Sequence, residues 1–308
     1  MKKLTLALAL CLAGCGIEPN ETGAADQSTD LTASGRAHHV RDYNGDTSET
    51  RTDRNAGHGG SRTVGISYHG GPVQTGTTNV YFIWYGNWAG NTAQQILPDL
   101  ASTLGGSPYF NINTTYYNGS NVHVQNAVHF AGSTSDNYSQ GKNLSDAQIL
   151  TVVTSAISSG ALPKDTSATY FVLTSSDVNA SSGFCTQYCG WHDHASVSGS
   201  DIKYAFIGNP DRCPSACEEQ TTGPNGNAGA DGMASIISHE LEESVTDPDL
   251  NAWYDRSGME NADKCAWTFG TTYKAANGAL ANMKLGSRDF LIQRNWLNVG
   301  AGSCAQSY

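Results

Sequence analysis

Apolar side chains recur at strand and helix spacings along most of the chain beyond residue 63. Residues 79–86 and 168–174 are rich in aromatic and β-branched side chains, and residues 202–208 repeat this pattern, which predicts three buried strands. Residues 121–130 alternate polar and apolar side chains, which predicts a strand with one exposed face. The folded part of the chain is therefore expected to contain a sheet.

Three other segments have the spacing of helices. Residues 92–104 place apolar side chains three and four positions apart, and residues 145–158 do so after Ser145, a suitable N-cap. A third helix is expected from about Asp231, which we take as its N-cap, to about Thr246. We therefore predict a mixed α/β fold, because strands that alternate with helices favour one sheet covered by helices.

The same pattern predicts a single domain over residues 63–308, with one central sheet flanked by helices and a loop-rich C-terminal part. Only 15% of the residues are charged, and 34 are glycine, which suits an exported protein of strands and ordered loops. Asp and Glu number 28 against 17 Lys and Arg, a formal net charge of −11. This balance argues against a nucleic-acid partner, because binding to phosphates needs clustered basic side chains.

Residues 1–14 have the features of a bacterial lipoprotein signal peptide. Lys2 and Lys3 precede an apolar stretch that is too short to remain as a membrane span, and no other apolar run reaches the length of about 18 residues that a span needs. The stretch ends in Leu-Ala-Gly-Cys, which matches a lipobox and predicts cleavage before Cys15 and acylation of its sulfur. We expect an outer-membrane lipoprotein, facing the periplasm or the exterior, that contacts the membrane through this lipid anchor.

Residues 15–62 differ in composition from the rest of the chain. They contain almost no large apolar side chains and no periodic pattern, so they cannot bury enough surface to offset the entropy cost of ordering. We predict a disordered tether or a removable pro-segment. His38, His39 and His58 lie here and are given no metal role, because histidines in a polar tail are usually solvated.

Six cysteines lie in the predicted domain, and in an exported protein they are disulfide candidates. They are Cys185, Cys189, Cys213, Cys217, Cys265 and Cys304. We expect short loops closed by Cys185–Cys189 and by Cys213–Cys217, and a third bond, Cys265–Cys304, that holds the C-terminus. Zinc binding by the two C-x3-C pairs is the weaker alternative, because export favours oxidation.

The third predicted helix carries the residues with the clearest chemistry. His239 and Glu243 are four residues apart and so project from one face, with Glu240 next to His239. Zinc accepts imidazole nitrogen and carboxylate oxygen, so His239 and Glu243 are candidate ligands, and Glu240 is a candidate catalytic base acting on metal-bound water. A catalytic zinc needs a third protein ligand. Glu260 and Asp263 are the candidates for that ligand.

Two other interpretations of this region stay open. A histidine and a glutamate one turn apart often form only a hydrogen bond. Asp247, Asp249, Asn251 and Asp255 offer oxygens at positions 1, 3, 5 and 9 of a calcium loop, although its glycine and its final glutamate are missing. Calcium is therefore a possible second ion, and the same residues also form a helix stop, because Pro248 follows Asp247.

Several stretches resemble the plant phosphate-induced protein, or EXORDIUM, family and its bacterial relatives. In order along the chain they are YHGGPV (68–73), VYFIWYGNW (80–88), VLTSSDV (172–178), GFCTQYCGWH (183–192), RCPSAC (212–217) and GADGM (229–233). The resemblance implies an exported protein associated with a wall or matrix, linked in plants to growth signalling and without an established catalytic activity. The bacterial relatives resemble this chain in HELxExxTDP followed by E-x-x-D-x-C, which fits the ligand set above.

Three further histidines lie within or beside these motifs. His69 is either a turn histidine bonded to the backbone or part of a pocket with Trp84 and Tyr85. His192 and His194 follow a predicted disulfide and are able to supply a metal ligand from another loop. For all three histidines, structural hydrogen bonding is the expected role.

Two functions follow from the sequence. The first is a lipid-anchored, zinc-dependent hydrolase at the cell surface, most simply a peptidase, with Glu240 as the base. The second is a non-catalytic envelope or matrix protein that binds peptide or glycan through the aromatic-rich segments 68–73 and 80–88. No Gly-x-Ser-x-Gly, P-loop or dinucleotide motif is present in the sequence, so serine hydrolase and nucleotide chemistry receive little support.

Overall fold

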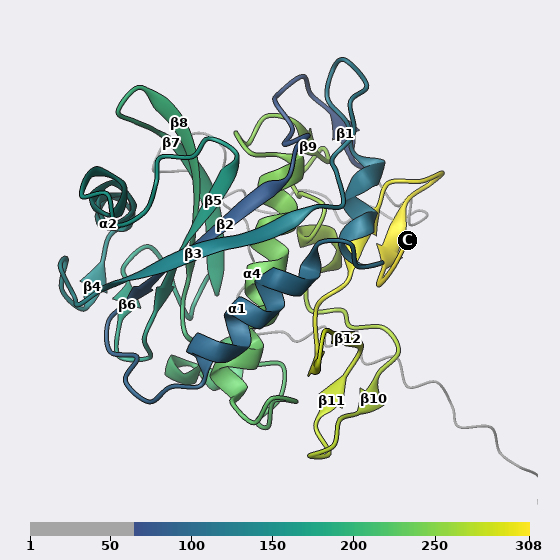
Figure 1. Cartoon of the computed structure of the whole chain (residues 1–308). Helices are drawn as coiled ribbons and strands as arrows, with labels where there is room; N and C mark the ends of the chain where they lie inside the picture. The colour runs from purple at the N-terminus through teal and green to yellow at the C-terminus, as the bar shows by residue number, and fades with distance from the viewer. Residues whose placement is uncertain (1–64) are drawn as a thin grey trace, which may run out of the picture.

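The computed structural model describes residues 65–308. The signal peptide, Cys15, the predicted tether and its three histidines lie outside the described residues, and their roles stay predictions. Figure 1 shows a twisted central sheet with helices packed against it and short paired strands to one side. This arrangement confirms the predicted mixed fold with a central sheet flanked by helices.

The central sheet has five strands in the order β3-β2-β5-β8-β7. The first four in this order run parallel, and β7 pairs antiparallel with β8 at one edge. β2 and β5 are buried along nearly all of their length, as is typical of parallel strands covered on both faces. The bounds are β2 (Thr78–Tyr85), β3 (Val128–Asp136), β5 (Ala168–Thr174), β7 (Gly190–Val197) and β8 (Ser200–Ile207).

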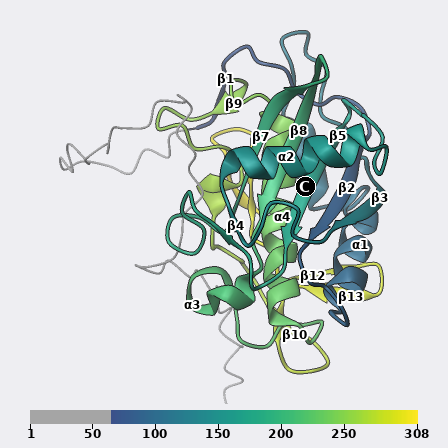
Figure 2. The same ribbon diagram turned by 90° about the vertical axis from the view of Figure 1, so that its left-hand side faces the viewer.

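Helices cover both faces of this sheet. α1 (Ala93–Leu104) and α4 (Ala228–Thr246) contact each other on one face, and α2 (Asp146–Ser158) covers the other, nearest the viewer in Figure 2. α2 begins at a capping box, in which Ser145 and Gln148 each accept a backbone hydrogen bond from the other. The predicted N-cap of this helix is therefore confirmed. The shorter helical segments are η1 (Phe110–Thr115), η2 (Pro210–Arg212), α3 (Pro214–Cys217) and η3 (Asp263–Cys265).

The strand predicted over residues 121–130 begins later than expected. Strand β3 starts at Val128, and the residues before it form a turn closed by an isolated bridge between Tyr117 and His123. Asn121 in this turn has a φ of 58°, which a continuous strand does not allow. Of the apolar residues that suggested a strand here, Val124 is buried but Val122 is 48% exposed in the turn, so the alternation does not mark one buried strand face.

The predicted start of the third helix is also wrong. α4 begins at Ala228, and the side chain of Asn227 caps it by accepting a hydrogen bond from the backbone N–H of Ala230. Asp231 lies within the first turn instead. Its carboxylate accepts hydrogen bonds from the backbone and side chain of Asn225, so it holds the preceding loop rather than the helix end.

Beyond the sheet, the chain forms pairs of short antiparallel or parallel strands. In the C-terminal part these are β10 (Tyr273–Lys274) with β11 (Leu280–Ala281), β12 (Met283–Leu285) with β13 (Arg288–Phe290), and β14 (Asn295–Leu297) with β15 (Ser303–Ala305). Elsewhere β1 (Ser67–Tyr68) pairs with β9 (Trp253–Tyr254), and β4 (Asn143–Leu144) pairs with β6 (Asn179–Ala180). The C-terminal part is loop-rich, as expected, and its loops are joined by short hairpins.

All six candidate cysteines form disulfides, but two of the expected pairings are wrong. The bonds are Cys185–Cys213, Cys189–Cys217 and Cys265–Cys304. The two C-x3-C segments lie side by side, with Cα–Cα distances of 5.7 and 5.6 Å across the first two bonds, so each cysteine pairs with the other segment and not with its near neighbour. Two bonds therefore join the chain just before β7 to the segment around α3.

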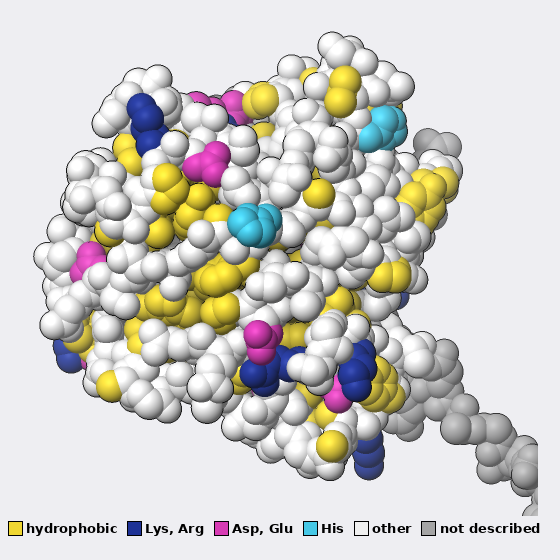
Figure 3. Space-filling model, in the orientation of Figure 1, with side chains coloured by type: hydrophobic (Ala, Val, Ile, Leu, Met, Phe, Trp, Pro, Cys, Tyr) yellow, Lys and Arg dark blue, Asp and Glu magenta, His cyan; other side chains and the backbone are white. Residues whose placement is uncertain are grey.

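Among residues 65–308, no helix has the length and apolar character needed to cross a membrane. The face drawn in Figure 3 is mostly uncharged polar surface, with scattered acidic and basic side chains and hydrophobic side chains gathered near its middle. This surface agrees with the low charged fraction of the sequence.

Candidate metal centre

Helix α4 runs through the core, and every residue from Gly229 to Thr246 is buried. Polar side chains on such a helix need partners inside the protein, because burial without a partner costs free energy. His239 and Glu243 lie one turn apart as the sequence predicts, with His239 Nε2 3.1 Å from Glu243 Oε1. Their side chains are 0% and 3% exposed, so no solvent screens this contact.

The segment after α4 adds two carboxylates to this face. The backbone N–H of Asp263 donates to Glu243 Oε1 over 3.0 Å, and Asp263 Oδ1 lies 3.5 Å from His239 Nε2. Glu260 is linked to the same group, because its backbone N–H donates to Asp263 Oδ2 over 3.2 Å. Both residues proposed as the third ligand therefore lie against the two on the helix.

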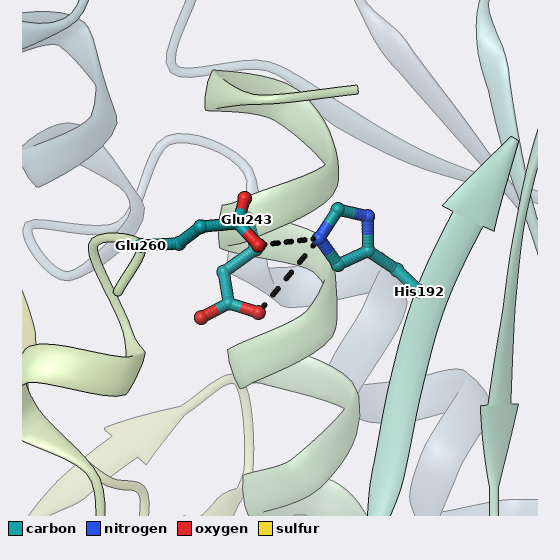
Figure 4. A group of neighbouring side chains, drawn as sticks. All are labelled: His192, Glu243 and Glu260. Carbon is teal, nitrogen blue, oxygen red and sulfur yellow. Dashed lines mark hydrogen bonds and ion pairs between the residues drawn. The ribbon is translucent and has the colours of Figure 1, made fainter. Parts of the chain in front are cut away.

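A second imidazole reaches the group from β7. His192 Nε2 lies 3.1 Å from Glu260 Oε2 and 3.8 Å from Glu243 Oε2. Figure 4 shows these three side chains pointing toward one another from the strand, the helix and the loop. From the sequence, structural hydrogen bonding is the expected role of His192 and a metal ligand supplied from another loop is the alternative, and the structure brings its imidazole to the carboxylates of Glu243 and Glu260.

Glu240, the candidate base, is part of the same group. Its side chain is buried, and a carboxylate oxygen of Glu240 lies within 4.8 Å of the ligand atoms of His239 and Glu243. We refer to the six residues as the core cluster: His192, His239, Glu240, Glu243, Glu260 and Asp263. Within the described residues, the ion pairs of Glu243, Glu260 and Asp263 run to histidine and none runs to lysine or arginine.

The electrostatics of the core cluster favour a proton or another cation at His192, His239, Glu243 and Glu260. Burial alone would lower the pKa of His192, but the nearby carboxylates of Glu260, Glu243 and Glu240 raise it to about 10. Burial likewise opposes the charged form of His239, yet Glu243 and Asp263 raise its pKa. Burial raises the pKa of Glu260 and of Glu243. A divalent cation would take the place of these protons, because metal ligands bind in their deprotonated forms.

The donor set fits a transition metal ion better than calcium. Imidazole nitrogen together with carboxylate oxygen suits zinc, iron or manganese, whereas calcium takes oxygen donors almost exclusively. Asp263 Oδ1 and Glu260 Oε1 are buried and have no hydrogen-bond partner among the described residues. Ligation would satisfy both of these oxygens.

The residues proposed for a calcium loop have separate partners. Asp247 Oδ1 accepts hydrogen bonds from the backbone N–H groups of Asn251 and Ala252. Asp249 forms an ion pair with Lys203, and Asp255 accepts from Ser257 and Lys264. The hydrogen bonds of Asp247 form a turn directly after helix α4. This turn agrees with the simpler interpretation of Asp247-Pro248 as a helix stop.

A second group of possible ligands lies at the surface. His194, Asp201 and Asp249 have ligand atoms within 4.8 Å of one another, and Lys203 contacts both carboxylates. The lysine ammonium therefore already supplies the positive charge that a metal ion would bring. We call these four residues the surface cluster.

The residues expected to line a pocket, His69, Trp84 and Tyr85, lie in two different environments. Trp84 and Tyr85 are buried in β2, so they do not form a binding surface with His69. His69 is exposed, and its ring stacks on Tyr254 with centroids 3.8 Å apart and an interplanar angle of 3°. The ring of Tyr117 lies 6.5 Å from that of Tyr68, the residue before His69.

The chain is similar to known proteins over most of its length. The sequence profile described as "Phosphate-induced protein 1 conserved region" matches residues 66–292. Protein EXORDIUM-like 3 of Arabidopsis thaliana is 31% identical over 281 residues, covering 78% of this chain and 83% of the plant protein. Protein EXORDIUM-like 5 of the same plant is 32% identical over 288 residues, covering 80% and 79%. Protein PHOSPHATE-INDUCED 1 of Nicotiana tabacum is 28% identical over 232 residues, covering 65% and 71%. No solved structure matches the chain.

Proposed function

Because the chain belongs to the phosphate-induced protein 1, or EXORDIUM, family, we propose that it is a non-catalytic protein of the cell envelope or matrix. In this proposal, zinc bound in the core cluster stabilises the fold, and an exposed aromatic surface binds a glycan. Cys15 carries the lipid that attaches the protein to the outer membrane.

One observation carries the metal part of the proposal. Two imidazoles and three carboxylates converge from β7, α4 and the 260–263 segment, and no side chain in these contacts is more than 12% exposed. Buried carboxylates need a cation or a proton to compensate them, and Glu243, Glu260 and Asp263 have no basic ion-pair partner among the described residues except histidine. A bound zinc ion would supply positive charge to these groups and tie three segments of the chain together.

The burial of the core cluster supports a structural role for the metal. Catalytic zinc keeps one coordination position open to water and substrate, whereas structural zinc is fully coordinated by protein. The second candidate function, a zinc-dependent hydrolase, is favoured by one feature: Glu240 is buried beside His239 where a catalytic base would lie.

The glycan surface lies where β1 and β9 pair, in the upper part of Figure 1. His69 and Tyr254 stack here, and Tyr117 and His123 extend the surface with ring centroids 5.2 Å apart. Aromatic rings of this kind offer a flat apolar face with a polar edge, which suits the face and hydroxyl groups of a sugar ring.

The first experiment measures metal content and hydrolysis with the purified full-length protein. We expect the wild type to contain bound zinc and His239→Ala to lose it. We also expect the wild type to hydrolyse peptides no faster than Glu240→Gln does. Hydrolysis by the wild type that Glu240→Gln abolishes would replace the structural proposal with the hydrolase. A folded protein that binds no metal would contradict both.

The second experiment tests the aromatic surface with soluble cell-wall polysaccharides in a binding titration. His69→Ala should weaken binding about tenfold or more, because it removes one ring of the stacked pair. Tyr273→Ala is the matched control, since Tyr273 is also an exposed aromatic residue, 42% exposed, and belongs to β10. Equal binding by wild type and His69→Ala would exclude the proposal that this surface binds glycan.

A further inference from the structure

We propose that the core cluster holds two divalent transition metal ions rather than one, bridged by the carboxylate of Glu243. This inference rests on the metal site of the proposed function and specifies its stoichiometry. It follows from how the donor atoms are distributed, from their number and from their charge.

The donor atoms divide into two groups that share one residue. His192, Glu243 and Glu260 form one group, and His239, Glu240 and Glu243 form the other, each with ligand atoms within 4.8 Å of one another. Donors on opposite sides of one ion are separated by about twice the metal–ligand bond, roughly 4 Å for nitrogen and oxygen ligands of zinc. Each group is therefore close to the size that one ion requires.

The two oxygens of Glu243 face different histidines. Oε1 lies 3.1 Å from His239 Nε2, and Oε2 lies 3.8 Å from His192 Nε2. A carboxylate with one oxygen directed to each of two imidazoles has the geometry of a bridging ligand. Asp263 Oδ1 adds a donor on the His239 side, and Glu260 Oε2 adds one on the His192 side, so each ion has its own terminal carboxylate.

The charge of the core cluster matches two ions. Glu240, Glu243, Glu260 and Asp263 carry four negative charges when ionised, and the histidines bind metal as neutral imidazoles. One divalent ion would offset two of these four charges, and two ions would offset all four, which reduces the cost of burying them. Two divalent ions give a neutral centre. Four carboxylates and two histidines also form the donor set of di-iron and di-manganese carboxylate proteins, in which the ligands project from facing helices.

Each ion would then fix a different contact of α4. The first ion, between His192 and Glu260, joins the helix to the edge strand β7 and to the loop after α4. The second ion, between His239, Glu240 and Asp263, joins the helix to η3. Removal of one terminal histidine is expected to release one ion and keep the other.

The test is the metal content of full-length protein after equilibration with zinc or with manganese and removal of free ion. We expect two ions per chain in the wild type, one in His192→Gln and two in His194→Gln. His194→Gln is the matched control, because His194 lies on the same strand but outside the core cluster. Manganese-loaded wild type should give the electron paramagnetic resonance signal of two coupled ions, which His192→Gln should lose.

One ion per chain, with an uncoupled manganese signal, would overturn the two-ion proposal and leave the single zinc site of the proposed function intact. No bound ion in folded protein would overturn both. If His192→Gln does not fold, the coupled or uncoupled signal of the wild type decides the question alone.

Discussion

Strand β7 carries two histidines on one face, two residues apart, that lie in opposite environments. His192 is 3% exposed among carboxylates that have no lysine or arginine ion pair within the described residues. His194 is 36% exposed and lies beside Asp201 and Asp249, which Lys203 contacts. Both clusters contain histidine and acid within reach of a metal ion. The difference teaches that burial, and the lack of a built-in cation, distinguish a candidate metal site from an ordinary surface ion pair.

Removal of metal should give the largest effect, and it should act only on the core cluster. A ligand present at about 1,000 times its Kd stabilises the folded state by about 4 kcal/mol. For a domain of this size, that corresponds to a fall in Tm of roughly 8–16 °C on chelation. Thermal unfolding with and without a chelator measures this shift. An unchanged Tm would mean that the core cluster, like the surface cluster, does not depend on a metal ion.

Loss of the Cys189–Cys217 bond should have the second-largest effect, because Cys189 directly precedes the strand that carries His192. Replacement of both cysteines by alanine should cost about 3 kcal/mol and weaken metal binding. The matched control is the Cys185–Cys213 pair, which has the same sequence separation of 28 residues but lies farther from the strand. Unfolding in urea and metal titration should show a similar loss of stability in the two double variants, with the greater loss of metal affinity in the first. Equal loss of affinity would mean that the position of β7 does not depend on the nearer bond.

Lys203→Met should remove the built-in cation of the surface cluster. Lys203 is buried, and its ammonium contacts Asp201 and Asp249, so its loss should cost about 1 kcal/mol in the free energy of unfolding. Urea unfolding measures this cost, and elemental analysis should find unchanged metal content. Tight metal binding by the new surface site would show that burial is not what separates the two clusters.

The smallest of these effects should be that of acid on the stability contributed by the surface cluster. Partial burial tends to raise the pKa of Asp201, but Lys203 and His194 bond to its carboxylate and hold the pKa below the usual 3.8. A lowered pKa in the folded state means that its stabilisation is present above about pH 4 and is lost as the pH falls below that value. Because this side chain is 46% exposed, the effect should be under about 1 kcal/mol. Asp201→Asn should flatten the stability curve of the protein below pH 4, and an unchanged curve would contradict this assignment.

Local sequence pattern was enough to predict β2, β5 and β8 nearly in full, only the first residues of β3, and the proximity of His239 and Glu243 on α4. β2, β5 and β8 are short runs of apolar residues with clear ends, and α1 and α2 have regular helical spacing. The 121–130 strand failed because a local turn can alternate polar and apolar residues without pairing. The disulfide pairing failed because it depends on two segments that the fold brings together.

His192 was considered from the sequence as a ligand from another loop but was not placed in the candidate ligand set, and a local signal for the strand that carries it exists. Ser198 and Gly199 have φ values of 50° and 76° and connect β7 to β8 in a two-residue hairpin. A Ser-Gly turn before a predicted strand indicates a partner strand on its other side. Applied here, that rule would have made residues 190–197 a strand. The contact between His192 and Glu260 would still depend on tertiary packing.

The disulfides that precede β7 have a consequence for how the protein matures. Thiols stay reduced in the cytoplasm and oxidise after export. Cys189 adjoins the strand that carries His192, so oxidation of Cys189 and Cys217 would help to hold this strand, and with it the imidazole, in place. In the exported metalloprotein that we propose, metal affinity would rise after this oxidation, and the identity of the ion would be set by what the outer compartment supplies.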